Sequence, residues 1–199
     1  MISEAPLGLR ERKKAEARVE IVATALRLFQ KRGFADVTID EIAELANVSR
    51  RTFFRYFPTK EDVVLERRRQ QLQAFRDALA TLEGSASDAV RQAFALVAAD
   101  YQKNKTRILS ERALLASARD LRVRDLEIDR EFESAIVDAV VARTRKSANN
   151  QRAARFFAAA AMGVVRVVID EWADAAGDAD IAALGRDALD AIVELLPTP

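Results

Sequence analysis

The sequence contains no cysteine and no histidine among its 199 residues. Without cysteine the chain can form no disulfide and offers no thiolate as a nucleophile or metal ligand. Without histidine it lacks the usual general base, the Ser-His-Asp arrangement and histidine-ligated metal sites, including the di-iron site of helical bundles. Much of enzyme chemistry is therefore excluded, and we expect no cofactor.

Glycine and proline are also scarce, with six and four residues, whereas 50% of the chain is hydrophobic and 32% is charged. Few helix breakers among abundant Ala, Leu, Arg and Glu favour an all-α protein. A chain of this length can bury a substantial core in one or two domains.

Long hydrophobic runs are missing as well. The longest, Phe156–Val165, is about half of the ~20 residues that a membrane-spanning helix needs. No apolar segment follows the early basic residues as it would in a secretory signal. We therefore expect a cytoplasmic protein that has no membrane partner.

The net charge of +1 hides an asymmetry along the chain. Residues 1–69 carry 15 Lys and Arg against 11 Asp and Glu, a balance of +4, and the remainder carries 17 against 20, a balance of −3. A basic N-terminal part on a mildly acidic body is typical of a protein with a local polyanion site.

Residues 38–60, TIDEIAELANVSRRTFFRYFPTK, predict two short helices joined by a tight turn. Thr38 and Glu41 fit a capping box at the start of the first helix. Asn47 tolerates the left-handed conformation that would end it, and Ser49 can cap the second. Pro58 limits the second helix to about two turns.

The second of these helices has two different faces. At about 100° per residue, Phe53 and Phe57 share one face, and Arg51 and Arg55 lie opposite. A short helix with buried aromatics behind and cations in front suits the DNA major groove, where arginine pairs bidentately with guanine. The alternative is a solvated basic face on an ordinary helical protein.

The surrounding residues resemble the N-terminal domain of the TetR family of bacterial regulators over about residues 15–65. The resemblance rests on Arg18, Ile21-Val22, Ala25, Leu28-Phe29, Gly33-Phe34, Thr38, Ile42-Ala43, Val48-Ser49, Thr52-Phe53, Tyr56-Phe57, Lys60 and Val63. Two residues depart from the family pattern. Asn47 stands where the family usually has Gly, and Phe54 stands where it usually has Tyr.

The expected architecture is an N-terminal three-helix helix-turn-helix domain, residues 1–58, and a helical ligand-binding and dimerisation domain, residues 59–199. We expect disorder at about residues 1–9, a long linking helix from Thr59 to about Leu82, and about nine helices in total. The last two helices are predicted at about residues 151–175 and 181–195. Within the linking helix, we expect Arg67–Arg69 to form a solvated face.

The resemblance implies three groups of functional residues. The DNA-binding residues would be Thr38, Ser49, Arg50, Arg51, Thr52, Phe54, Arg55, Tyr56 and Lys60. Candidates for a ligand pocket are Phe75, Leu79, Phe94, Tyr101, Leu109, Leu114, Phe132, Ile136 and Phe157, which are also suited to plain core. Candidates for a dimer interface are Ala159, Ala160, Gly163, Val167, Trp172, Leu189 and Ile192.

The function expected from this resemblance is a homodimeric transcriptional regulator, a repressor that a small effector releases from a near-palindromic operator. The string at Ser49–Val63 and the pattern from Ala98 to Leu195 resemble a TetR subgroup whose C-terminal domain binds acyl-CoA-like ligands. We therefore expect an apolar or acyl-CoA-like effector. Two alternatives stay open: a DNA-binding or architectural protein that acts through protein partners without a ligand, and a helical enzyme.

Overall fold

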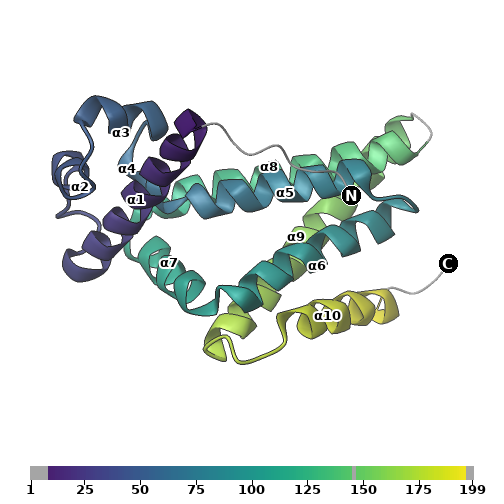
Figure 1. Ribbon diagram of the computed structural model, residues 1–199. Helices are drawn as coiled ribbons and strands as arrows, with labels where there is room; N and C mark the ends of the chain where they lie inside the picture. Colours follow the sequence, from purple (N-terminus) through teal and green to yellow (C-terminus); the bar gives the residue numbers. More distant parts are fainter. Residues whose placement is uncertain (1–8, 145–146, 196–199) are drawn as a thin grey trace. The chain divides into compact units, whose positions relative to one another are not determined.

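The computed structural model describes residues 9–144 and 147–195, with side chains described for 12–144 and 147–188. Within these residues the protein consists of helices and contains no strand, which confirms the all-α prediction (Figure 1). The helices are α1 (Leu9–Arg32), α2 (Ile39–Leu45), α3 (Arg50–Tyr56), α4 (Lys60–Val64), α5 (Glu66–Thr81), α6 (Ala86–Lys103), α7 (Lys105–Ser117), α8 (Arg119–Arg143), α9 (Ala148–Asp174) and α10 (Ile181–Leu195). None of these helices is both long and apolar enough to cross a membrane.

Two packing units divide the chain. The first unit contains the chain up to Arg67 together with Glu111–Arg124, and the second contains Arg68–Ser110 together with the chain from Asp125 onward. The sequence places a domain boundary between residues 58 and 59, whereas packing assigns α4 and the later segment Glu111–Arg124 to the first unit. The predicted disorder of residues 1–9 concerns residues outside the described part, apart from Leu9, which begins α1.

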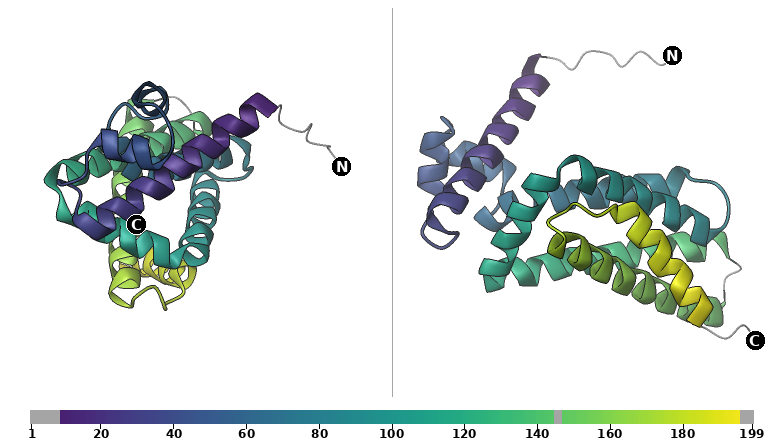
Figure 2. Two further views of the ribbon diagram at one scale, coloured as in Figure 1. Left: turned by 60° about the vertical axis from the view of Figure 1, so that its left-hand side comes forward. Right: turned by 90° about the horizontal axis from the view of Figure 1, so that it is seen from below.

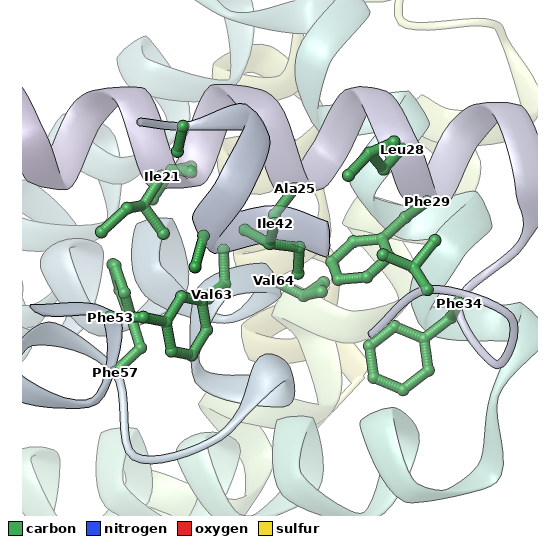
Figure 3. Close-up of a cluster of buried hydrophobic side chains, with 14 of the residues drawn as sticks. Ile21, Ala25, Leu28, Phe29, Phe34, Ile42, Phe53, Phe57, Val63 and Val64 are labelled. Atoms are coloured by element: carbon green, nitrogen blue, oxygen red, sulfur yellow. The ribbon is translucent and has the colours of Figure 1, made fainter. Parts of the chain in front are cut away.

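The core of the first unit forms where α1 packs against α2, α3 and α4. Side chains of α1, including Ile21, Ala25 and Phe29, point toward Ile42, Phe53, Phe57, Val63 and Val64 (Figure 3). These residues are almost completely buried, and the aromatic pair Phe29 and Phe34 adds a ring contact at 5.0 Å between centroids. This packing holds α2 and α3 on α1 and so fixes the orientation of their exposed faces.

The segment Glu111–Arg124 joins this core from far along the sequence. Leu114 and Leu121 belong to the same buried cluster. Glu111 accepts a hydrogen bond of 2.5 Å from Arg67, and both side chains are more than nine-tenths buried. Arg124 lies 3.6 Å from the carboxylate of Asp62. The first unit therefore depends on residues that a reading of the N-terminal sequence alone does not include.

The linking helix is interrupted, which corrects the expectation of one helix from Thr59 to about Leu82. Thr59 begins α4 with the predicted capping box to Asp62, but the helix ends at Leu65, whose φ is −85° and ψ is 0°. Val63, Val64 and Leu65 are all buried. On one straight helix they would span about 200° of its surface. The interruption follows directly on these buried residues and raises the number of helices in the described residues to ten.

The expectation of a solvated face at Arg67–Arg69 is wrong for Arg67 and Arg68. Arg67 is buried with Glu111 in the first unit. Arg68, in the second unit, pairs with Asp125 at 3.0 Å and with Asp129. Burial lowers the pKa of Arg68, but Tyr101 and the two carboxylates outweigh it, so the pKa is raised. Arg69 matches the expectation better, because its side chain is 45% exposed.

The second unit packs the remaining helices around two groups of aromatic residues. Phe75 of α5 contacts Phe94 of α6 and Phe132 of α8, with ring centroids 4.8 and 5.1 Å apart. Trp172 of α9 is fully buried and meets Tyr101 of α6 at 5.4 Å. Helix α10 runs beside α9 and also contacts α6 (Figure 2).

Candidate nucleic-acid interface

Local capping interactions build the helix-turn-helix segment as the sequence predicts. The Thr38 hydroxyl accepts from the backbone N–H of Glu41, and the Glu41 carboxylate accepts from the backbone N–H of Thr38 at 2.9 Å. Asn47 adopts the left-handed conformation, with φ of 52°. Ser49 then caps α3 by accepting from the backbone N–H of Thr52 at 3.0 Å. Because every signal lies within four residues, the sequence alone specifies this segment.

Helix α3 has the two faces that its periodicity predicts. Phe53 is fully buried, and Phe57, directly after the helix, is 1% exposed. Arg50, Arg51 and Arg55 are exposed, and Phe54 is 41% exposed. The buried rings fix the helix, so its arginines form a cationic surface on a rigid element.

Two of the three arginines already contact neighbouring side chains. Nη1 of Arg50 donates to both carboxylate oxygens of Asp40, at 2.7 and 2.6 Å. The Arg55 guanidinium lies 4.9 Å from the centre of the Tyr56 ring and donates to its hydroxyl at 3.2 Å. The side chain of Arg51 is exposed on the same helix.

The predicted phosphate-binding hydroxyls lie at the ends of α2 and α3. Thr38 and Ser49 are exposed, although both hydroxyls serve as helix caps, and Ser49 is also 2.9 Å from the Thr52 hydroxyl. Tyr56 is only 9% exposed, and its hydroxyl accepts from Arg55. Phosphate contacts from these groups stay a prediction.

Lys60 has a structural role that the sequence did not reveal. Its ammonium donates to the backbone carbonyls of Phe34 at 2.8 Å and Val37 at 3.1 Å, and lies 3.4 Å from that of Ala35. It also sits 4.4 Å from the centre of the Phe34 ring. Lys60 therefore holds the loop between α1 and α2, and its predicted phosphate contact remains untested.

Charged contacts from α1 anchor the surrounding elements. Arg32 donates to Glu41 at 2.7 Å and to the carbonyl of Asp36. The backbone N–H of Thr38, the Arg32 guanidinium and the Thr38 hydroxyl together lower the pKa of Glu41 to about 2. Arg18 binds the Glu66 carboxylate at 2.7 and 2.6 Å, which raises the pKa of Arg18.

Sequence reasoning missed Asp40, Arg32 and Glu66 as partners in this region. Each contacts a residue on another helix, at a separation of 9 to 48 residues. No helical periodicity relates such pairs, so the charges could be seen in the sequence but their pairing could not.

The candidate pocket residues lie in three places. Phe75, Phe94 and Phe132 form the ring cluster of the second unit, and Leu79 and Ile136 are also buried there. Tyr101 and Leu109 pack around Trp172. Leu114 packs in the core of the first unit, and Phe157 is half-buried on α9.

A surface groove of about 470 Å³ lies between α5 and α8 of the second unit. Its lining residues are Arg76, Leu79, Ala80, Ser134, Ala135, Asp138, Ala139, Ala142 and Arg143. Among the candidate pocket residues, Leu79 contributes to this lining. Within the described residues, no group of three or more acidic, histidine or cysteine side chains could hold a metal ion.

The candidate dimer residues on α9 are divided between surface and core. Ala159 and Ala160 are exposed, Gly163 is half-buried and Val167 is 55% exposed. Phe156, one turn before Ala160, is 65% exposed. Trp172 is fully buried within the second unit, and the side chains of Leu189 and Ile192 lie outside the described ones.

Comparisons with known proteins match both halves of the chain. Residues 21–66 match the family described as bacterial regulatory proteins, tetR family, and residues 84–197 match the MftR C-terminal domain. The HTH-type transcriptional regulator TcmR of Streptomyces glaucescens is 30% identical over 196 residues, covering 93% of this chain and 86% of TcmR. EthR of Mycolicibacterium smegmatis is 49% identical, over only 23% of this chain and 21% of EthR.

Solved structures agree on the fold. FadR of Thermus thermophilus, a TetR-family transcriptional repressor in complex with lauroyl-CoA, has a TM-score of 0.61 at 24% identity, covering 92% of this chain and 96% of FadR. The TetR-family regulator SCO0857 of Streptomyces coelicolor has a TM-score of 0.62 at 18% identity, covering 93% and 97%. At these identities the likeness establishes the arrangement of helices.

Proposed function

The chain belongs to the TetR family of helix-turn-helix transcriptional regulators, and from this premise we propose that it is a ligand-released repressor. It binds a near-palindromic operator as a homodimer and acts in the cytoplasm. Membership of a family of regulators sets aside the helical enzyme. The observation that carries the proposal is the exposed cationic face of α3, supported from behind by Phe53 and Phe57.

In this proposal α3 enters the major groove. Arg50, Arg51 and Arg55 read base edges, since arginine pairs bidentately with O6 and N7 of guanine. Phe54 can contact a thymine methyl group. Thr38, Ser49, Thr52, Tyr56 and Lys60 contribute to phosphate contacts, which position the protein without reading sequence.

The homodimer is proposed to form through the exposed apolar face of α9. Val167 and Phe156 expose more than half of their surfaces, and Ala159 and Ala160 permit close approach of a second helix. A second subunit would remove this apolar surface from water. The dimer would place two copies of α3 about 34–36 Å apart, which matches two half-sites one helical turn apart.

The effector is proposed to be apolar or acyl-CoA-like and to bind the second unit. FadR of Thermus thermophilus, which shares the fold, binds lauroyl-CoA. The groove between α5 and α8 combines apolar Leu79 and Ala139 with cationic Arg76 and Arg143. The ligand releases DNA by binding better to a form of the dimer whose α3 helices do not fit the operator.

Helices α5, α7 and α8 each pass from one packing unit to the other, after Arg67, Ser110 and Arg124 respectively. We propose that these helices carry the effect of ligand binding from the second unit to the first. Reciprocity of binding free energies requires that operator DNA lower the affinity for the effector by the same factor.

One observation favours a regulator without an effector. Phe75 packs against both Phe94 and Phe132 in the second unit, so these rings already occupy space that the candidate pocket would need. Calorimetric titration of the protein with lauroyl-CoA and with free laurate, in the presence and absence of operator, separates the two functions. If the protein binds either compound and operator DNA weakens that binding, the result supports a repressor with an acyl effector. If the protein binds neither compound, the result favours a protein that acts through partners.

The DNA-binding proposal predicts the effect of Arg51→Ala. The truncation should weaken binding to a duplex selected from a randomised pool by about tenfold or more, because one bidentate contact is worth about 1–3 kcal/mol. Thermal unfolding should be unchanged, since Arg51 is exposed. Fluorescence anisotropy with the full-length protein measures the affinity. An unchanged affinity would mean that α3 presents another face to DNA.

A further inference from the structure

Asp40 forms an ion pair with Arg50, one of the three arginines on the exposed cationic face of α3. It lies in the first turn of α2, and its carboxylate reaches Arg50 at the start of α3. Both carboxylate oxygens accept from Nη1 of Arg50, at 2.7 and 2.6 Å. The two side chains are 64% and 63% exposed, so the ion pair lies on the outer surface of the helix-turn-helix segment.

Phe54 restrains the same guanidinium from a second side. It follows Arg50 by one helical turn, and the guanidinium carbon lies 5.5 Å from its ring centroid. At this distance the cation is attracted to the face of the ring. The carboxylate thus accepts hydrogen bonds from Nη1, and the ring attracts the cation toward Phe54. The edge formed by Nε and Nη2 is the edge that these two contacts leave for a base.

Stability does not account for this pair. Ion pairs between exposed side chains contribute little to folding, because water and salt screen them. A carboxylate beside a DNA-reading helix also repels phosphates and so weakens binding to every sequence. A contact that contributes little to folding and weakens general DNA binding is best explained by an effect on sequence discrimination.

We propose that Asp40 is a specificity-determining residue that positions Arg50 to read one guanine in each half-site with its Nε–Nη2 edge. This inference rests on the proposed function, in which α3 enters the major groove. Bidentate pairing with O6 and N7 of guanine requires a fixed plane and direction of the guanidinium. Holding the side chain in advance reduces the conformational freedom that it loses on binding.

Two variants with the same change in charge test the proposal. Asp40→Asn removes the carboxylate that holds Arg50, and Glu44→Gln removes an exposed carboxylate from the same helix. Each full-length protein is first used to select duplexes from a randomised pool. Affinities are then measured for three duplexes. They are the duplex that the wild type selects, the same duplex with the base pair of the guanine read by Arg50 replaced in each half-site, and a scrambled duplex.

For Asp40→Asn we expect discrimination at one base pair per half-site to fall about tenfold, while affinity for the scrambled duplex rises. Glu44→Gln should raise affinity for all duplexes by one factor and leave discrimination unchanged. In an Arg50→Ala background, Asp40→Asn should cause no further loss of discrimination, because the residue acts through Arg50.

Three results would overturn the proposal. If Asp40→Asn raises all affinities as Glu44→Gln does, the carboxylate is a surface charge only. If Asp40→Asn discriminates between the duplexes better than the wild type does, Asp40 keeps Arg50 from contacting DNA. If the wild type selects no sequence at all, the proposed function fails as well, and this outcome is distinct from the first two.

Discussion

At the scale of single residues, the structure gives several charged side chains partners that change their expected roles. Lys60 resembles a phosphate contact in the sequence, yet its ammonium holds the loop between α1 and α2 through backbone carbonyls. Arg67 is buried with Glu111 instead of facing solvent. In both cases the residue type was visible in the sequence, but the partner comes from a distant segment and could not be deduced from it.

The loop contact of Lys60 predicts that Lys60→Met lowers stability as well as DNA affinity. Hydrogen bonds from a charged donor contribute about 1.5–3 kcal/mol, and partial exposure of these carbonyls reduces the loss to about 1–2 kcal/mol. Urea unfolding of the two proteins measures the difference as a shift in midpoint with unchanged slope.

Lys13→Met provides the matched control, because Lys13 is exposed on α1. This variant should keep the wild-type stability. Unchanged stability of Lys60→Met, together with a salt dependence of DNA binding reduced by about one counterion, would instead make Lys60 a phosphate contact only.

At the scale of the helices, the features set by neighbouring residues were predicted correctly, and those that depend on distant residues were not. The capping boxes at Thr38 and Thr59, the cap at Ser49 and the left-handed Asn47 all depend on residues within one turn. The interruption at Leu65 coincides with the complete burial of that side chain, which no local pattern records. For the same reason the exposed face of α3 was predictable, whereas the Asp40–Arg50 pair was not.

The start of α2 should carry a pH-dependent part of the stability. The folded pKa of Glu41 is about 2, below its ordinary value of 4.5, so the carboxylate stabilises the fold above the ordinary pKa. This contribution is lost as the pH falls from about 4.5 through about 2. The difference in unfolding free energy between wild type and Glu41→Gln should therefore be constant at neutral pH and shrink across this acidic range.

Urea unfolding at a series of pH values measures this difference. Glu44→Gln serves as the control, because it removes an exposed carboxylate from α2 and leaves the capping box of Thr38 and Glu41 intact. A difference between wild type and Glu41→Gln that stays constant down to the lower end of that range would contradict the hydrogen bonding described for Glu41.

At the scale of the whole molecule, the account depends on a dimer that presents two reading helices. The exposed apolar residues of α9 are the surface proposed for this contact, and Val167 belongs to it with 55% of its surface exposed. Linking two weak half-site contacts in one dimer can raise operator affinity by about 10²–10⁴-fold without any new base contact. The dimer is therefore as important to the proposed function as the arginines of α3.

Val167→Glu should shift the protein toward the monomer, because a charge placed in an apolar interface loses its water without gaining a partner. Leu96→Glu is the matched control, since Leu96 is 59% exposed on α6 of the same packing unit. Sedimentation velocity over a range of concentrations measures both variants. If Val167→Glu dimerises as the wild type does, the dimer interface lies elsewhere.

The most direct test of the central claim is methylation interference at guanine N7 with the wild-type protein on its selected duplex. Guanine N7 lies in the major groove and is one of the two atoms that arginine contacts. The account predicts interference at guanines in two half-sites about 34–36 Å apart. In Arg51→Ala, the interference at the guanines that Arg51 contacts should disappear. Binding that no methylated guanine impairs, or a single cluster of affected bases, would contradict two copies of α3 reading successive major grooves.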